Sequence, residues 1–418
     1  MRIVVLGAAG GVGRTAAQAI AREPDITELV LADVHVPAIN ALAAELAADA
    51  QTSCGNVRTV SVDARYITDV IDVITGADCV LNCIGPFYDF GPPLLRAAIS
   101  ARVPYVDVCD DLTPTQTMLG MSPAAEAAGV PALIGMGNSP GLANLFAAVA
   151  ADGLLDTVDS VDIMHIHGGE PDEGAAVVKH RIFAMMNDIP LFLDGEFQTV
   201  RQLEASGVAA VRQTDFPGLG IYPVYPYPHP ETITLPTYLP GLRRATNLGV
   251  IFPLPYFTLT QDMVRTGACS TTPLDVGGQM VIPLEFSVAH IRAQRARILT
   301  QAGVTGPAGC LKVEVGGLSA GNPTSYVFTV SSTSAGAGEG TGIPAAAGAA
   351  MMARGAFAEM AGVFPPEAVP DPLGLLALTA RMATTFGPGA TDTIAVNRID
   401  ADGSVTHIPL ALWAMPAR

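Results

Sequence analysis

With 418 residues, half of them apolar, the chain is long enough for two domains or for one large domain with an insertion. A formal net charge of −17 without a compensating basic stripe excludes nucleic acid as a partner. The mean hydropathy of +0.39 is high, yet no segment reaches the roughly 18 uninterrupted apolar residues of a membrane span, so we expect no membrane association.

Cysteine usage predicts a reducing compartment. The six cysteines contain no CxxC pair and no dense framework, and we expect no metal site. The chain also begins inside a predicted strand, which leaves no room for a secretory leader. We therefore expect a cytoplasmic protein.

The first third of the chain alternates strands and helices with short connections. This alternation predicts a doubly wound α/β domain of the Rossmann type, with a parallel sheet and ligands beyond the carboxyl ends of its strands. The predicted strands are residues 2–6, 28–32, 57–61, 79–82, 105–108 and 132–135, and the predicted helices are 12–22, 36–48, 67–75, 92–101 and 123–128.

The opening strand runs into a glycine-rich turn, and an acid ends the next strand. Gly7 permits a tight turn and Gly13 lets the helix pack closely, while the glycines between them let the backbone approach a pyrophosphate. Asp33 would bind the adenosine ribose. This layout predicts a dinucleotide, NAD or NADP. The expected contact residues are Gly7, Ala9, Gly10, Gly11, Val12, Gly13, Asp33, Asp63, Asn82, Cys83, Gly85, Pro86 and Phe87.

After about residue 157 the pattern changes to alternating runs and proline-rich loops, which predicts an inserted α/β (α+β) domain on a more open, mixed sheet. We expect strands in 160–167, 192–200, 311–315 and 325–331, a helix over 176–186, a loop over 220–236, a linker over 331–342, helices over 345–361 and 373–384, and a hairpin around 400–403. The expected divisions are a Rossmann domain (1–140), an inserted domain (141–339) and C-terminal helices with a hairpin (340–418).

Three groups of motifs resemble the saccharopine dehydrogenase-like reductases. Residues 78–87, with 91–98 and 103–107, are similar to their strand-and-loop signature, and 340–349 with 362–367 are similar to the helix that returns to the nucleotide domain. Residues 177–181, 189–195 and 229–232 resemble the branch that includes lysine 6-dehydrogenases. The resemblance implies an inserted substrate and dimerisation domain, a homodimer, and NAD(P)-linked chemistry at a C–N bond of an amino acid or polyamine.

The residues after Asp33 favour NAD over NADP. Many NADP-using relatives place arginine directly after this acid, to meet the 2′-phosphate, but here Val34 and His35 follow. A carboxylate repels a phosphate, and only His35 or Arg14 could compensate.

Oxidation of an amine needs an uncharged nitrogen, so a proton acceptor must lie beside the site of hydride transfer. His180 is our leading acid–base candidate because imidazole titrates near neutrality; a core or interface position is the alternative. Tyr105 and Asp107, with Asp110 and Asp111, gather at the end of the fifth predicted strand and are further catalytic candidates, although acids in a surface turn are equally common.

A substrate carboxylate would need a guanidinium fork, and Arg181, Arg243 and Arg244 are the candidates, with ordinary salt bridges as the alternative. His165 and His167 share one strand face without a third ligand, which favours sheet packing over a metal pair. The tyrosines at 222, 225 and 227 would either cover the pocket or pack between subunits, and residues 139–144 would begin a helix whose amides face the nicotinamide.

The sequence therefore predicts an NAD(P)-dependent oxidoreductase that acts on a C–N bond, with oxidative deamination of lysine or a related amino acid as the first hypothesis. The alternative is an NADPH-dependent reductase of the saccharopine, opine or carboxynorspermidine type, which condenses an amine with a keto acid or aldehyde. A nucleotide-binding scaffold without turnover is the alternative of another class.

Overall fold

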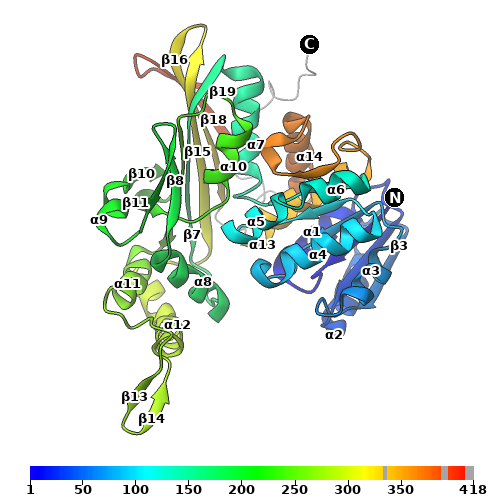
Figure 1. The fold of residues 1–418 in the computed structure, drawn as a ribbon, viewed down its shortest axis with the longest axis horizontal. Helices are drawn as coiled ribbons and strands as arrows, with labels where there is room; N and C mark the ends of the chain where they lie inside the picture. The colour runs from blue at the N-terminus through cyan, green and yellow to red at the C-terminus, as the bar shows by residue number, and fades with distance from the viewer. Residues whose placement is uncertain (333–336, 387–393, 410–418) are drawn as a thin grey trace.

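The computed structural model describes residues 1–332, 337–386 and 394–409. Two lobes lie side by side, each built on its own sheet, and a two-stranded arm extends from one of them (Figure 1). We call them the Rossmann lobe and the second lobe. No helix among the described residues is long and apolar enough to cross a membrane.

The Rossmann lobe contains a seven-stranded parallel sheet in the order β17-β6-β5-β4-β1-β2-β3. All six strands expected from the sequence are present, and β17 adds an edge strand that was not expected. The strands are β1 (Arg2–Leu6), β2 (Glu28–Asp33), β3 (Asn56–Ser61), β4 (Cys79–Asn82), β5 (Tyr105–Asp107), β6 (Pro131–Leu133) and β17 (Gly362–Phe364).

Helices cover both faces of this sheet, as a doubly wound fold requires. One face lies under α1 (Gly11–Ala21), α2 (Val36–Ala48) and α13 (Ala337–Ala353), and the other under α3 (Ile67–Ile74), α4 (Phe87–Ala101), α5 (Leu112–Leu119) and α6 (Ser122–Ala128). The helix expected from residue 92 begins five residues earlier, at Phe87, so its two prolines lie inside it. Helix α5 was not expected.

The second lobe contains a ten-stranded mixed sheet in the order β10-β11-β12-β7-β15-β16-β18-β19, with β8 and β9 paired beside β12. Among the described strands of this sheet, only β12 and β7 run parallel. The strands are β7 (Thr157–Gly168), β8 (Ile189–Leu193), β9 (Glu196–Val200), β10 (Arg212–Phe216), β11 (Gly220–Pro226), β12 (Arg244–Phe252), β15 (Ala308–Ser319), β16 (Asn322–Ser332), β18 (Ile394–Asp400) and β19 (Val405–Ile408).

The helices of the second lobe are α8 (Ala175–Met186), α9 (Ala205–Ala209), α10 (Glu231–Tyr238), α11 (Leu254–Arg265) and α12 (Pro283–Gln301), and the arm is the hairpin of β13 (Leu274–Val276) and β14 (Gln279–Val281). Two expectations for this lobe were wrong. Residues 192–200 are a hairpin rather than one strand, because Asp194 and Gly195 take positive φ and reverse the chain. The proline-rich stretch 220–236 holds β11, with Pro223 and Pro226 inside it, and most of α10, with Pro236 inside it.

The two faces of strand β7 contact different parts of the molecule. Val161 and Ile163 belong to the apolar core shared with the Rossmann lobe, whereas Met164 and Ile166 pack under α8, α11 and α12. Since side chains alternate along a strand, His165 and His167 point toward the Rossmann lobe.

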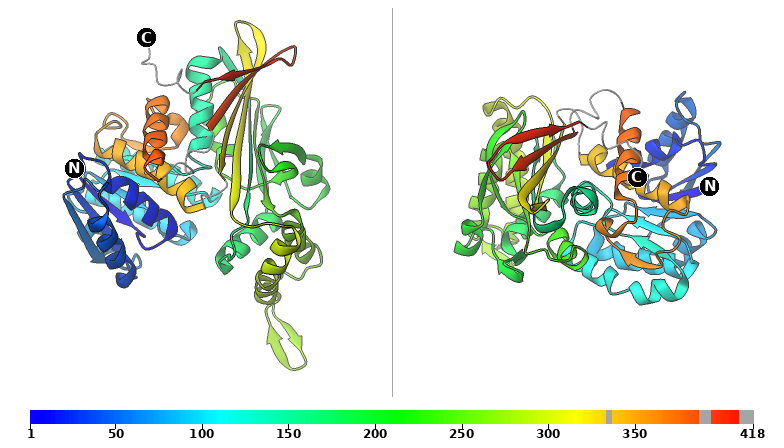
Figure 2. Two further views of the ribbon diagram at one scale, coloured as in Figure 1. Left: turned by 180° about the vertical axis from the view of Figure 1, so that it is seen from behind. Right: turned by 90° about the horizontal axis from the view of Figure 1, so that it is seen from above.

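Two helices of the described structure connect the lobes, α7 (Leu142–Val149) and α13. Helix α7, continued by a π-helical turn (Ala150–Leu154), packs against β15 and against α14 (Pro372–Thr384), and Figure 2 shows it between the lobes. Helix α13 carries the chain back, and it begins at Ala337 rather than at residue 345, so Pro344 lies inside it. Part of the expected linker 331–342 lies outside the described residues. The expected C-terminal hairpin is β18–β19, and it extends the second sheet through β16.

We expect the close contact of α13 with α1 to tolerate only glycine at position 342. A Cβ there would lie 2.7 Å from the Val12 carbonyl oxygen and 2.8 Å from Thr15 Cβ. Gly342→Ala should lower the free energy of unfolding by about 1–3 kcal/mol, measured by urea denaturation. Gly340→Ala, whose Cβ would meet nothing within 4 Å, is the control. Equal stability of the two variants would contradict this packing.

Candidate active site between the two lobes

The glycine turn forms a cradle of backbone that a dinucleotide fits. Gly7 has a φ of +80°, and a Cβ at Gly13 would lie 2.2 Å from the Gly7 carbonyl oxygen, so both positions exclude side chains. At the tip, Gly10 and Gly11 are exposed and Gly11 has open space beside its Cα. Since α1 begins at Gly11, its free amides point toward this space, where a pyrophosphate would bind.

Asp33 lies at the end of β2 and supports the turn. Its Oδ2 accepts a hydrogen bond from the Ala9 amide (3.0 Å), and its Oδ1 accepts one from the His35 amide (2.9 Å). The two basic groups that could offset its charge are engaged elsewhere: Arg14 pairs with Glu45, and His35 Nδ1 accepts the Ala38 amide at the start of α2.

Asp63 follows β3, where Arg65 pairs with its carboxylate at 2.6 Å. The hydrogen bonds from Arg65 lower the pKa of Asp63. The N-cap of α3 is Tyr66, so Asp63 precedes the helix without capping it.

The loop after β4 shows which of its residues can reach a cofactor. Asn82 is fully buried; its Oδ1 accepts the Ile84 amide and its Nδ2 donates to the Tyr105 hydroxyl. Gly85 and Pro86 are exposed, whereas the Phe87 side chain lies in the core. The exposed backbone of this loop is therefore available to a ligand, and Phe87 is not.

Tyr105 and Asp107 were expected to face the substrate, and the structure corrects this. Both are fully buried, and neither lines the pocket described below. The Tyr105 hydroxyl donates to Asp107 Oδ2 (3.0 Å), while Asp107 Oδ1 accepts the amides of Cys109 (3.0 Å) and Gly135 (2.8 Å). The pair positions the loops after β5 and β6. Burial raises the pKa of Asp107 to about 6.

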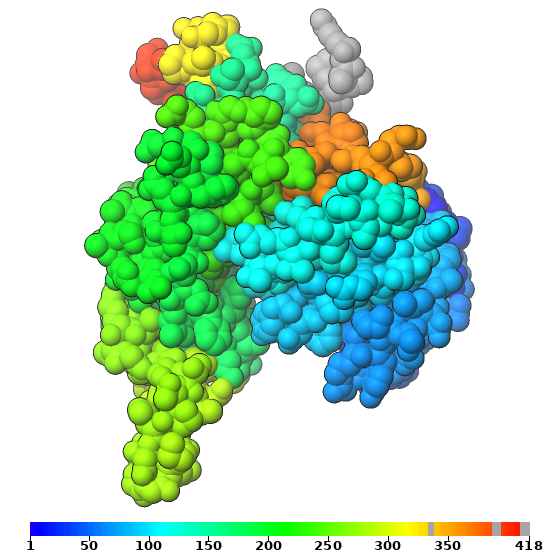
Figure 3. All heavy atoms as spheres, in the orientation of Figure 1, coloured from blue at the N-terminus to red at the C-terminus, as the bar shows by residue number. Residues whose placement is uncertain are grey.

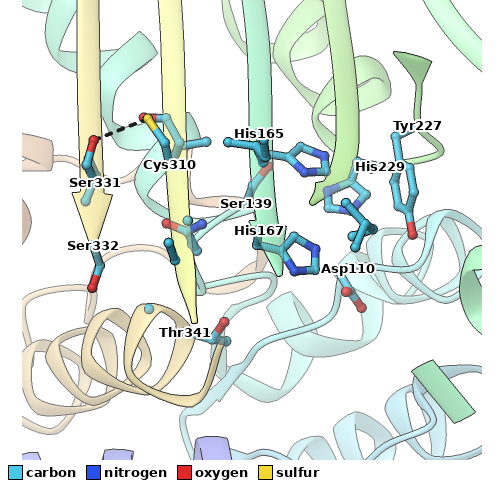
Figure 4. A pocket seen from close by; sticks show the side chains of 18 of the residues that line it. Asp110, Ser139, His165, His167, Tyr227, His229, Cys310, Ser331, Ser332 and Thr341 are labelled. Carbon is cyan, nitrogen blue, oxygen red and sulfur yellow. Dashed lines mark hydrogen bonds between the residues drawn. The ribbon is translucent and has the colours of Figure 1, made fainter. Parts of the chain in front are cut away.

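A cavity of about 320 Å³ lies where the lobes meet, beyond the carboxyl ends of β5 and β6. Figure 3 shows the surface hollowed between the lobes, and Figure 4 shows the side chains that converge in the cavity. Its lining comes from three places. The Rossmann lobe contributes Asp110, Asn138 and Ser139, the start of α13 contributes Gly340 and Thr341, and the second lobe contributes His165, His167, Glu170, His180, Arg181, Tyr227, His229, Cys310 and others.

His180 lines this cavity, as its candidate role requires. Its Nδ1 lies 3.6 Å from Asp111 Oδ1, and its side chain is 37% exposed. Asp110 also lines the cavity, and burial together with its charge raises the pKa of Asp111. Within the described parts of the chain, no lysine or arginine pairs with Asp110 or Asp111. This end of the cavity therefore carries excess negative charge.

The three arginine candidates lie in different places. Arg181 lines the cavity but is only 2% exposed, and both of its terminal nitrogens bind Glu173, at 2.8 and 3.0 Å. Arg244 pairs with Asp162, and Arg243 is exposed at the start of β12. Since β12 reaches the cavity only near Ile251, the expectation that Arg243 and Arg244 bind substrate there was wrong.

A buried polar cluster that the sequence did not predict forms the base of the cavity. His229 lies with its Nδ1 3.5 Å from Glu231 Oε2, and Ser139 and Asn247 hold the other oxygen of Glu231. His165 Nε2 lies 3.1 Å from Asn247 Oδ1. In the sequence, only the family resemblance of residues 229–232 pointed to His229 and Glu231 as site residues. No local sequence pattern pointed to Asn247.

Among the described residues, no group of three or more His, Cys, Asp or Glu side chains is arranged to hold a metal ion. The six cysteines are free thiols, five of them buried.

The chain is similar in sequence to several known proteins. Residues 3–133 match the family model of the saccharopine dehydrogenase NADP binding domain. The chain is 26% identical over 392 residues to carboxyaminopropylagmatine dehydrogenase of Synechocystis, covering 89% of this chain and 94% of that protein. It is 26% identical over 410 residues to carboxynorspermidine synthase of Vibrio alginolyticus, covering 89% and 93%.

A solved structure shows the same fold. The L-Glu-forming saccharopine dehydrogenase of Saccharomyces cerevisiae superposes with a TM-score of 0.65 at 13% identity, covering 97% of this chain and 99% of that one. The expected fold class, family resemblance and NAD(P)-binding domain are confirmed. Residues 3–133 are therefore similar to a saccharopine dehydrogenase NAD(P)-binding domain, and the whole chain has the saccharopine dehydrogenase fold.

The raised pKa of Asp107 makes stability depend on pH in a defined direction. Between about pH 4, where the carboxyl titrates in the unfolded chain, and about pH 6, the folded protein binds more protons. The free energy of unfolding should therefore fall as pH rises through this window, by roughly 1–3 kcal/mol from this group. In Asp107→Asn this contribution is lost, so its stability relative to wild type should rise from pH 4 to pH 6 in urea denaturation. Asp69→Asn, at an exposed acid of α3, is the control, and parallel curves for Asp107→Asn would contradict the assignment.

Proposed function

We propose that this saccharopine dehydrogenase-like chain forms, or in reverse cleaves, the C–N bond of a carboxylated amine that carries a further positive charge. The observation that carries the proposal is the acidic end of the cavity, where Asp110 lines the space for substrate and Asp111 lies beside His180. Neither acid has a guanidinium or ammonium partner in the described structure. A second cationic nitrogen of the substrate would supply the missing charge.

The relatives support this proposal over the first hypothesis, deamination of lysine. Their names describe a carboxylated agmatine and a carboxylated norspermidine. Both are amines joined to a carboxylated group, which is the chemistry of the condensing alternative. The chain's own acidity, −17 overall, also suits a cationic substrate.

The residues of the Rossmann lobe would hold the cofactor at the glycine turn, at Asp33 and along the loop after β4. When bound there, the nicotinamide supplies or accepts a hydride. The chain's own contribution is to orient the substrate across the cavity and to move protons at its nitrogen and oxygen. Two imidazoles beside acids are available for that: His180 with Asp111 near the opening, and His229 with Glu231 at the base.

Cofactor choice is a finer proposal, and we infer a preference for NAD. The carboxylate of Asp33 would repel a 2′-phosphate, Arg14 is paired with Glu45, and His35 Nδ1 accepts the Ala38 amide.

The expected homodimer and the cytoplasmic location stay predictions. The surface best suited to a partner copy is the arm with the start of α12, where Leu274, Val276, Met280 and Phe286 are 55%, 61%, 64% and 61% exposed. Such a cluster of exposed apolar side chains is unusual on a monomer.

An absorbance assay of purified protein tests the function. Reduced and oxidised NAD and NADP are each combined with lysine, with polyamines, and with polyamine plus keto-acid or aldehyde pairs. We expect turnover with an amine–carbonyl pair and a KM for the amine that rises roughly tenfold, about 1.4 kcal/mol, in Asp110→Asn. Asp69→Asn should leave it unchanged. Turnover only with free lysine and NAD, or an unchanged KM in Asp110→Asn, would contradict the proposal.

Asp33→Asn tests the cofactor preference. Asparagine keeps an acceptor for the Ala9 amide but removes the charge, so the ratio of the NADP to the NAD dissociation constant should fall roughly tenfold, from the loss of a charged hydrogen bond worth about 1.5 kcal/mol. Isothermal titration calorimetry measures both constants. Glu45→Gln, which releases Arg14, should move the ratio the same way by less. A ratio that does not change in Asp33→Asn would exclude Asp33 as the discriminating group.

A further inference from the structure

We propose that His229 is the catalytic proton-transfer residue at the base of the cavity and that Glu231 is its positioning residue, anchored to both lobes through Ser139 and Asn247. The inference rests on the proposed function and deepens it, because it assigns the proton that C–N bond formation requires.

The anchoring of Glu231 is the first observation. Glu231 is the first residue of α10 and is completely shielded from solvent. Its Oε1 accepts hydrogen bonds from the Ser139 hydroxyl, in the loop after β6, and from Asn247 Nδ2 (3.3 Å), on β12. Asn247 Nδ2 also donates to Ser139 Oγ (3.1 Å). The carboxylate is therefore fixed by one group from each lobe.

The second observation is that the other oxygen of Glu231 lies close to an imidazole nitrogen of His229. Glu231 Oε2 and His229 Nδ1 are both buried, and neither makes a hydrogen bond with any described residue. They lie 3.5 Å from each other. A buried carboxylate needs a compensating charge, and the nearest group that can carry one is the His229 imidazole.

The surroundings of His229 direct its other nitrogen to the substrate. Because Nδ1 lies against Glu231, Nε2 is the ring atom left to face the cavity that His229 lines. The ring is held between His165, stacked at 5.5 Å, and Tyr227, which meets it edge-on at 5.2 Å. Figure 4 shows these three rings together at the base of the cavity.

His165 supports this arrangement as a neutral ring. Asn247 uses its amide nitrogen for Ser139 and Glu231, so its Oδ1 is left to accept a hydrogen bond from His165 Nε2 (3.1 Å). Gly249, opposite His165 on β12, makes room for the ring, since a Cβ there would lie 2.2 Å from His165 Cε1. Burial and the neighbouring His229 and His167 place the pKa of His165 well below its usual value.

The charges around His229 favour its protonation. Burial by itself would lower the pKa of His229, but Glu231 on one side and Asp110 and Asp111 on the other raise it. His167, on β7, and Arg181, on α8, line the same cavity, and Arg181 is paired with Glu173. The surroundings therefore favour the protonated form of His229, whereas those of His165 favour the neutral form.

One proton on His229 Nε2 serves both directions of the condensation. The substrate ammonium gives a proton to His229, and the freed nitrogen forms a C–N bond to the carbonyl carbon while its second proton moves to the carbonyl oxygen. His229 then returns its proton to the resulting hydroxyl. The C–O bond breaks, water leaves, and the nitrogen lone pair forms C=N. Addition of one hydride, supplied by the reduced dinucleotide, to that carbon completes the secondary amine.

His180 has a different place in this scheme. It lies nearer the opening, paired with Asp111, and Tyr227 stands between it and His229, at 6.2 Å from one ring and 5.2 Å from the other. His180 is accessible to water, whereas His229 is shielded with its counter-charge. The two imidazoles can therefore be separated by experiment.

The test combines a pH–rate profile with an NMR titration. In the condensing direction, His229→Gln should lower kcat roughly 100-fold or more with an unchanged dissociation constant for the dinucleotide. Glu231→Gln removes the carboxylate that favours the imidazolium, so the alkaline limb of the kcat profile should move to lower pH by about one unit. The ring signal of His229, identified by its absence in His229→Gln, should titrate at correspondingly lower pH in Glu231→Gln.

Controls and outcomes separate this inference from the proposed function. His290→Gln, at a surface histidine of α12, should change nothing. Glutamine at the fully buried position 231 could prevent folding, and Glu231→Asp is then the second variant. Its shorter side chain keeps the charge but places it farther from His229, so the pH at which His229 titrates should fall by a smaller amount. Unimpaired turnover in His229→Gln would overturn the inference. So would a His229 ring signal that titrates at the same pH in the wild type and in the Glu231 variants. If the titration shifts as expected but every amine–carbonyl pair is silent, the proposed function fails, and with it the catalytic role of His229.

Discussion

A carboxylate without access to water, Glu231, is the constraint on which the site depends. A buried carboxylate is costly without partners, and the partners of Glu231 come from the loop after β6, from β12 and from the loop before α10. The relative position of the two lobes is therefore coupled to the protonation of His229. A cavity assembled in this way holds its polar groups in fixed positions before any ligand enters, which reduces the cost of organising them during reaction.

The apolar core supplies the rigidity that this arrangement requires. One continuous cluster of buried side chains extends from the Rossmann sheet through α7 to β7 and β15, so the lobes are docked by packing as well as by hydrogen bonds. Helix α13 contributes from the other side. Gly338 and Gly342 let it lie against the first turn of α1, and both helices begin beside the glycine turn. Two helix N-termini thus face the region where the phosphates of a dinucleotide would bind.

Much of the Rossmann lobe could be predicted from the sequence, because local signals determine it: apolar runs, the Gly7–Gly13 spacing and the acid at 33. The second lobe was less predictable. Its hairpin at 189–200 depends on positive φ at Asp194, and α10 forms in spite of Pro236. The base of the cavity was not predictable from local pattern at all. Ser139, His165, His229 and Asn247 lie in separate elements, and the parallel pairing of β7 with β12 and the docking of the two lobes bring them together. Arg244 was mistaken for a ligand because the sequence does not show which end of its strand meets the other lobe.

A crystal structure of the full chain with reduced NAD bound would test most directly whether this junction is the active site. The account predicts that the nicotinamide lies beyond the ends of β4 and β5, with one face open to the cavity lined by Ser139 and His229. A nicotinamide on another surface, or one separated from His229 by protein, would contradict it.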